Sequence, residues 1–198
     1  MVSRKVFDKL KELYGTTSSW TIWAEPVNGN WKTKDAVSDM TPFKEEDELI
    51  GSLNGDYIFV ALNPAVHNLL HPQSVWENFH SNDSRRSQDY KLRYALYGTD
   101  YWGSFITDLY VDIHDTNSGS AMGMVTNART RAAIDDLCYI RELLGGHATI
   151  IALGGKTYTV LKKNLPEGVL LKKIMHYSNY INPEKYRENV QNGLIGPF

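Results

Sequence analysis

The chain has very little cysteine and no long apolar run. Cys138 is the one cysteine among 198 residues, so a single chain cannot form an internal disulfide, a four-cysteine zinc site or a four-cysteine iron–sulfur cluster. No apolar run approaches the roughly 18 residues that cross a bilayer, and the first residues lack the apolar core of a signal peptide. These absences predict a cytoplasmic protein without a membrane partner, an iron–sulfur cluster, a bound metal or a cofactor.

An excess of positive charge is also missing. The formal net charge is −2, so binding to a polyanion such as DNA requires a local patch rather than the whole surface. Hydrophobic residues make up 42% and charged residues 22% of the chain, which is typical of a globular protein. Five Trp and twelve Tyr fit an aromatic core better than a groove that stacks planar groups. We expect residues 1–198 to form a single domain.

Residues 1–54 are expected to form an N-terminal helix and an irregular Trp-rich excursion that packs on the body of the domain. Apolar residues recur at helical spacing over residues 3–14, and a glycine then ends the helix. Residues 16–42 mix Trp with Gly, Asn, Thr and Pro and show no sustained period. A Thr-Pro pair at residues 41–42 is suited to the N-cap and first position of a short second helix.

Four apolar runs alternate with helical patterns along the rest of the chain. Such runs are typical of strands buried on both faces of a parallel sheet. Right-handed crossovers between them place helices on both faces. The pattern therefore predicts an α/β fold, a three-layer α/β/α sandwich with a central, mainly parallel four-stranded sheet. The expected strands are residues 57–62, 104–110, 148–153 and 169–175, and the expected helices are residues 88–97, 127–144, 156–164 and 183–191.

Polar turns follow all four strands, at what the fold makes one edge of the sheet. Ligands of open parallel sheets bind beyond this edge, because strand-to-helix loops and helix N-termini meet there. Each turn alone also fits a structural role as an ordinary βα turn, a solvated carboxylate or a hydrogen-bonded histidine, and the glycines lack the spacing of a P-loop or dinucleotide fingerprint. Their common edge favours a shared site. The turns are Asn63-Pro64, Thr107-Asp108, Gly154-Gly155-Lys156 and His176-Tyr177-Ser178.

Two other segments bear on metal and phosphate binding. His67 and His71 are four residues apart and fit one helical face as metal ligands, but Pro72 argues against a continuing helix and so disfavours zinc. Residues 79–87 are polar and contain an adjacent pair of arginines, which makes them the best candidate for a local phosphate-contacting patch. A solvated loop explains the same residues.

Taken in order, the strand-end turns resemble the motifs of the uracil-DNA glycosylase superfamily, closest in style to its mismatch-specific branch. Ala61-Leu62-Asn63-Pro64 is similar to the family's Gly-x-Asp/Asn-Pro motif. Phe105-Ile106-Thr107-Asp108 looks like its Ile-Thr-Asn pattern, with Asp in place of Asn. Leu153-Gly154-Gly155-Lys156 matches a Leu-Gly-Lys turn, and His176-Tyr177-Ser178 matches the His-Pro-Ser motif in part. The resemblance covers roughly residues 55–182.

The resemblance implies a hydrolase of DNA repair that cleaves the N-glycosidic bond of a flipped-out base. Its partner would be DNA or another ligand that contains a nucleobase. Asn63 would hold the hydrolytic water, and His176 would donate a hydrogen bond to a carbonyl of the departing base. The implied substrate-binding residues are Asp108 at the base edge, Phe79 as the stacking ring, and Ser178, Gly155 and Lys156 at the flanking phosphates.

Two residues depart from the family pattern. An ionised Asp108 only accepts hydrogen bonds, whereas an amide also donates, so Asp108 suits an exocyclic amine or a purine N–H in place of the uracil edge. Tyr177 replaces a proline in the loop that would approach the minor groove. A catalytically silent nucleotide- or nucleic-acid-binding domain of the same fold therefore stays open. A small-molecule α/β hydrolase also stays open, although the chain lacks a Gly-x-Ser-x-Gly elbow.

Overall fold

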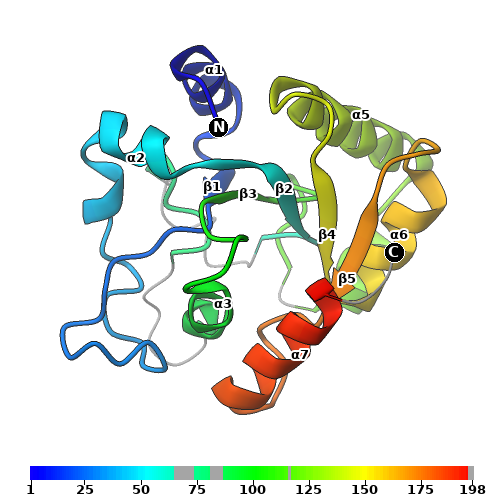
Figure 1. Ribbon diagram of the computed structural model, residues 1–198. Helices are drawn as coiled ribbons and strands as arrows, with labels where there is room; N and C mark the ends of the chain where they lie inside the picture. The colour runs from blue at the N-terminus through cyan, green and yellow to red at the C-terminus, as the bar shows by residue number, and fades with distance from the viewer. Residues whose placement is uncertain (65–73, 81–86, 116, 196–198) are drawn as a thin grey trace.

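A five-stranded mixed sheet lies at the centre of the computed structural model, which describes residues 1–64, 74–80, 87–115 and 117–195 (Figure 1). The strands are β1 (Ser18–Trp20), β2 (Asn54–Ala61), β3 (Ser104–Asp108), β4 (Thr149–Leu153) and β5 (Leu171–Ile174). They lie in the order β1-β3-β2-β4-β5, so β1 and β5 form the two edges. β1 is antiparallel to β3, and the other neighbouring strands are parallel.

The prediction of four strands was wrong, because β1 adds a fifth and makes the sheet mixed. The other four strands overlap the four expected runs. β1 falls in the stretch that we expected to be irregular, and its three residues are too few to reveal an alternating pattern. Tertiary contacts hold it: the Ser18 hydroxyl donates to the Thr107 hydroxyl at 2.8 Å, and Trp20 is fully buried.

Seven α-helices are found in the described part of the chain. They are α1 (Arg4–Tyr14), α2 (Glu46–Ser52), α3 (Asp89–Leu96), α4 (Ser118–Gly123), α5 (Asn127–Leu143), α6 (Gly155–Asn164) and α7 (Pro183–Ile195). The short helix expected from residue 41 is a 3-10 turn at Thr41–Phe43 followed by α2. None of the described helices is long and apolar enough to cross a membrane.

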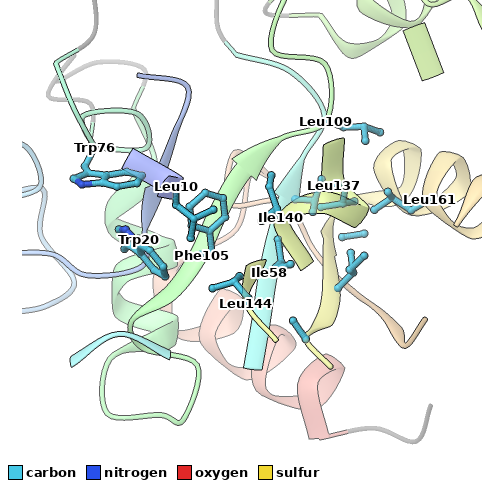
Figure 2. Close-up of a cluster of buried hydrophobic side chains, with 14 of the residues drawn as sticks. Leu10, Trp20, Ile58, Trp76, Phe105, Leu109, Leu137, Ile140, Leu144 and Leu161 are labelled. Atoms are coloured by element: carbon cyan, nitrogen blue, oxygen red, sulfur yellow. The ribbon is translucent and has the colours of Figure 1, made fainter. Parts of the chain in front are cut away.

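The helices cover both faces of the sheet. Alternate side chains of β2 point to opposite faces, so Ile58 and Val60 join one core cluster and Phe59 and Ala61 join the other. α1, α5 and α6 contribute to the first cluster, which Figure 2 shows, and α3 and α7 contribute to the second. In Figure 1, α1 and α5 lie above the sheet and α3 and α7 lie below it. β3, β4 and the second half of β2 are therefore buried on both sides, as their apolar runs predicted, whereas β5 at the sheet edge is only partly buried.

The strand register places the carboxyl ends of the four parallel strands at one level. Asp108 of β3 pairs with Ala61 of β2, and Leu153 of β4 pairs with Ile174 of β5. Val60 pairs with Ala152, so Leu153 lies level with Ala61. The chain leaves β2 for β3 on one side and later reaches β4 on the other side. The strand order thus reverses at β2, and a crevice at such a reversal is the usual ligand site of an open α/β sheet.

Arg93 of α3 anchors the Trp-rich excursion between β1 and α2. Its buried guanidinium donates to the carbonyl oxygens of Thr33 at 2.7 Å and Asp35 at 2.6 Å. It also lies 5.5 Å from the ring centroid of Trp31, which stacks on Tyr97 at 3.6 Å. Charge-assisted hydrogen bonds to backbone oxygens replace the regular structure that this stretch lacks. The excursion is consequently fixed to the same helix that borders the strand ends.

Gly103 provides a test of how the start of β3 is held. Its φ is +79°, its N–H donates to the Thr21 carbonyl oxygen, and its own carbonyl oxygen accepts from the Asn54 N–H. A Cβ at this position would overlap the Ser52 carbonyl oxygen. We expect Gly103→Ala to lower the free energy of unfolding by roughly 2–5 kcal/mol, from the left-handed backbone and the overlap together. Chemical denaturation measures this loss.

Gly98→Ala is the matched control. Gly98 has a φ of +72°, but a Cβ there meets no atom within 4 Å. Only the backbone cost of about 1–2 kcal/mol should therefore appear. Equal losses for the two variants would contradict the close approach of Gly103 to Ser52.

Candidate functional site

The candidate residues lie at one edge of the sheet. Asp108 is the last residue of β3, and Asn63, Gly155 and His176 each follow their strand by two residues. Because the strand ends are level, these positions form a row that runs across β3, β2, β4 and β5. Neighbouring strands are about 4.8 Å apart, so the row extends over roughly 14 Å. The structure thus brings the four predicted turns to one edge.

The Asn63 side chain is held in one orientation. Its Nδ2 donates to the carbonyl oxygens of Pro64 at 3.0 Å and Asp115 at 2.7 Å. Only the amide nitrogen can meet two carbonyl oxygens, so these contacts decide which side-chain atom is which. Oδ1 is then the atom left to accept a hydrogen bond from a ligand or a water molecule. This orientation suits a residue that positions water.

The half-buried His176 is held as a neutral imidazole. Its Nδ1 accepts a hydrogen bond from the backbone N–H of Ser178 at 3.1 Å, and the Ser178 hydroxyl lies 2.9 Å from the same atom. Burial lowers the pKa of His176 to about 4. A neutral ring whose Nδ1 is an acceptor carries its proton on Nε2. At neutral pH, His176 therefore presents a single N–H donor.

The turns after β4 and β5 are in contact. Gly154 has a φ of +94°, and its N–H donates to the Ile174 carbonyl oxygen at 2.9 Å. A Cβ on Gly154 would lie 3.4 Å from the Cβ of His176. The backbone conformation thus favours glycine, and the His176 turn packs at ordinary contact distance from this position. α6 begins at this junction.

Tyr177 connects the His176 turn to two carboxyl groups. Its ring stacks on the His176 ring with 4.3 Å between the centroids and 28° between the planes. The carboxyl group of Asp89 lies near its hydroxyl at the start of α3. Burial, followed by the negative charges of Asp89 and Asp108, raises the pKa of Tyr177 well above 10. Lys91 also joins α3 to this loop, since its ammonium donates to the Asn179 carbonyl oxygen at 3.0 Å.

Asp108 is a buried carboxyl group that receives one side-chain hydrogen bond from the described residues. Its exposed fraction is 5%, and its Oδ2 accepts from the Asn78 amide at 3.2 Å. Asn78 is itself fixed, because its Nδ2 also donates to the Thr17 carbonyl oxygen at 2.6 Å. Burial raises the pKa of Asp108, the Asn78 hydrogen bond lowers it and the charge of Asp89 raises it, and together they bring the pKa to about 7. A large fraction of Asp108 is thus protonated at neutral pH.

Asp108 also borders a cavity of about 350 Å³ between α1, α5 and the ends of β2 and β3. The size falls within the usual range of small-molecule sites. Asn63 and His176 are not among its lining residues, so Asp108 is shared between this cavity and the cluster that contains Tyr177. The residues that line the cavity are Leu13, Tyr14, Thr17, Val60, Thr107, Asp108, Leu109, Val111, Ala133, Asp136, Leu137 and Ile140.

The other predicted binding residues lie around this edge with different degrees of access. Phe79 is 7% exposed and its ring packs in the second core cluster, with a strained backbone φ of +67°. Gly155 begins α6, and the Lys156 ammonium donates to the Ser118 hydroxyl at 3.0 Å on the surface. Ser178 is exposed and contacts His176. The structure therefore shows Phe79 as a core residue and the others as accessible.

Asn78 and Asp89 are the residues that sequence reasoning missed. Neither belongs to a strand-end motif, and an acidic residue in the first turn of a helix has an ordinary role toward the helix dipole. Each is only 6% exposed, which sets it apart from an ordinary surface residue, and a sequence does not display this burial. The sequence alone therefore could not identify these two residues.

The histidine pair and the phosphate patch fall mostly outside the described residues. This applies to His67, His71 and residues 81–86. Within the described ranges, no group of three or more His, Cys, Asp or Glu side chains is arranged to hold a metal ion. No model of a protein family matches the chain, and no curated protein matches it. The case for a function thus comes from the strand-end residues and their contacts.

The protonation of His176 can be measured directly. We expect its imidazole to stay neutral with the proton on Nε2 from pH 8 down to about 5, because burial lowers its pKa to about 4. Nitrogen-15 NMR of the histidine rings across this range distinguishes the two neutral tautomers and the cation. In the unfolded chain the ring takes up a proton near its ordinary pKa of 6.5, whereas in the folded protein it does so only near 4. The free energy of unfolding should therefore decrease as the pH falls from about 6.5 to 4.

His147 serves as the internal reference. It is exposed, and its Nε2 lies 2.8 Å from Oδ1 of Asp56, a contact that raises the pKa of His147. The two rings should therefore titrate on opposite sides of the ordinary value of 6.5. A His176 that titrates together with His147 would refute the neutral donor.

Proposed function

We propose that this chain is a uracil-DNA-glycosylase-like hydrolase that cleaves the N-glycosidic bond of a flipped-out base in DNA. The observation that carries the proposal is the neutral His176, whose Nε2–H donor lies on the same sheet edge as the acceptor oxygen of Asn63. The helices on both faces of a mainly parallel sheet are consistent with the three-layer sandwich of that family.

The two residues supply complementary parts of the reaction. When the glycosidic bond breaks, the departing base gains negative charge, and a fixed N–H donor such as Nε2 of His176 stabilises that charge on a carbonyl oxygen. The sugar is left electron-deficient at its anomeric carbon. A water molecule held by Oδ1 of Asn63 then attacks that carbon, and its proton passes to the released base or to solvent. The net reaction consumes one water and yields free base and an abasic sugar.

DNA contacts in this proposal come from a local surface. Gly155 at the N-terminus of α6 offers backbone N–H groups, and Lys156 adds a positive charge beside it. Ser178 is exposed on the neighbouring turn. Such contacts position the backbone of a nucleic acid without reading its sequence. They also fit a chain whose net charge is −2, because only one edge has to attract phosphate.

A catalytically silent binding domain is the second candidate. The buried ring of Phe79 favours it, since a ring packed in the core is not presented to a flipped base. The Tyr177 ring stacked on His176 favours it as well, because it lies beside the proposed donor. Such a domain binds nucleotides or nucleic acid without turnover.

Base release from oligonucleotides tests the proposal. Single-stranded and duplex oligonucleotides that contain uracil, hypoxanthine or xanthine are incubated with the protein, and the free base is measured. We expect release from at least one of them. His176→Ala should lower the rate by about 10²–10³-fold through loss of the donor, and Asn63→Ala by about 10²-fold through loss of the positioned water.

His147→Ala is the matched control, because His147 is an exposed histidine next to the opposite end of β4. Its rate should equal that of the unmodified protein. Absence of release from all three bases would refute the hydrolase. If oligonucleotide binding then survived His176→Ala with unchanged affinity, the silent binding domain would be supported in its place.

A further inference from the structure

The cavity between α1, α5 and the ends of β2 and β3 combines an apolar wall with acidic side chains. Its apolar residues include Leu109, Leu137 and Ile140, which Figure 2 labels. The carboxyl groups of Asp108 and Asp136 border the same space of about 350 Å³. The described residues that line it include no lysine, arginine or histidine. The lining therefore favours a ligand that is partly apolar and positively charged.

Asp108 is the buried acid of this lining. It is 5% exposed, and within the described ranges its side-chain hydrogen bond comes from the Asn78 amide to Oδ2 at 3.2 Å. Oδ1 receives no hydrogen bond from a described side chain, and no described cation pairs with the carboxyl group. A buried carboxylate without a positive partner is unfavourable, so a bound cation would stabilise the ionised form. The free oxygen of Asp108 is thus a recognition point for a positive group.

Exposed lining residues mark the open side of the cavity. Leu13 is 44% exposed and Val111 is 39% exposed, and both are apolar. Asp136 is exposed as well, and its charge adds to burial in raising the pKa of Tyr14 to about 12. The Thr17 hydroxyl donates to the Tyr14 carbonyl oxygen at 3.3 Å, which leaves the hydroxyl oxygen as an acceptor. A ligand that enters here passes apolar side chains and meets acceptors.

We propose that this cavity binds a small primary amine with an apolar body, whose ammonium group pairs with Oδ1 of Asp108 while its apolar part packs between α1 and α5. An ammonium group needs one free carboxylate oxygen, whereas a guanidinium group is bound best by two, and Asn78 already occupies Oδ2. Anionic ligands such as nucleotides are repelled by the two carboxyl groups. The hydrocarbon wall lacks the several oxygen ligands that a metal ion requires.

The amine site is separate from the proposed base-releasing residues. Asn63 and His176 are not among the residues that line the cavity. Amine binding is therefore independent of base release, and each can be measured without the other.

Calorimetric titration with three matched compounds tests the charge requirement. Phenethylamine is the cation, 2-phenylethanol the neutral analogue and 3-phenylpropionate the anion. The titrations are run at about pH 8, where phenethylamine is protonated and Asp108, with its pKa of about 7, is mostly ionised. We expect phenethylamine to bind about 10–100-fold more tightly than 2-phenylethanol, because only the ammonium pairs with a buried carboxylate. 3-Phenylpropionate should not bind.

Variants locate the bound amine. Asp108→Asn keeps the shape of the side chain and removes its charge, so the preference for phenethylamine over 2-phenylethanol should be lost. Ala133 lines the cavity, and Ala133→Phe should fill it and abolish binding of both compounds while Asp108 stays in place. Ala132→Phe is the matched control, because Ala132 is the preceding residue of α5, is exposed and is not among the lining residues. Its affinities should equal those of the unmodified protein. Asp135→Asn, which removes an exposed neighbouring carboxyl group outside this lining, should also change nothing.

Chemical shifts of the unmodified protein keep the test decisive if a variant folds poorly. On addition of phenethylamine, the largest changes in a nitrogen-15 spectrum should fall on lining residues such as Tyr14, Leu109 and Leu137. No binding of phenethylamine, or equal binding of 2-phenylethanol, would overturn the amine site. An unchanged preference in Asp108→Asn, equal effects of Ala133→Phe and Ala132→Phe, or shifts confined to other surfaces would overturn it too. All these results leave the proposed hydrolase standing, because none of them depends on base release.

Discussion

The parallel pairing of β2 with both β3 and β4 is the constraint on which the site depends. Both faces of β2 are covered, so Ile58, Phe59 and Val60 are fully buried and the strand has no freedom to slide. A slip of one residue would move each β2 side chain to the opposite core cluster and disrupt the packing of both. The fixed register brings all the parallel strands to an end at one level. The polar turns that follow the strands then lie side by side, because β3 is added on one side of β2 and β4 on the other.

Burial lowers the pKa of His176 and raises that of Asp108, and both changes favour the uncharged form of the side chain. His176 is a base and loses its proton, whereas Asp108 is an acid and keeps one. Both are thereby uncharged over part of the physiological range. Asp89 provides the nearby negative charge that strengthens this tendency in Asp108.

Patterns local to the chain predicted much of this architecture, and long-range contacts account for the remainder. The apolar run at residues 57–62, most of which lies in β2, and the turn at Asn63 were both recognisable, because burial on two faces and a proline after a strand leave a signature in sequence. β1 left none, since its three residues are held by contacts with distant parts of the chain, such as Thr107 of β3 and the carbonyl oxygen of Trp76. The direction of the Phe79 ring and the approach of Asn78 to Asp108 likewise depend on folding alone. Side-chain orientation was thus harder to anticipate than the position of the edge.

β5 is the outermost parallel strand, and its composition has a consequence for self-association. A strand at the edge of a sheet is a template on which another chain can add a strand. Two successive positions of β5 are lysines: the Lys172 ammonium donates to the Leu194 carbonyl oxygen, and that of Lys173 lies 5.3 Å from the Tyr158 ring centroid. An incoming strand would have to displace these contacts and desolvate two ammonium groups. The strand that leads into the His176 turn is thereby protected against edge-to-edge aggregation.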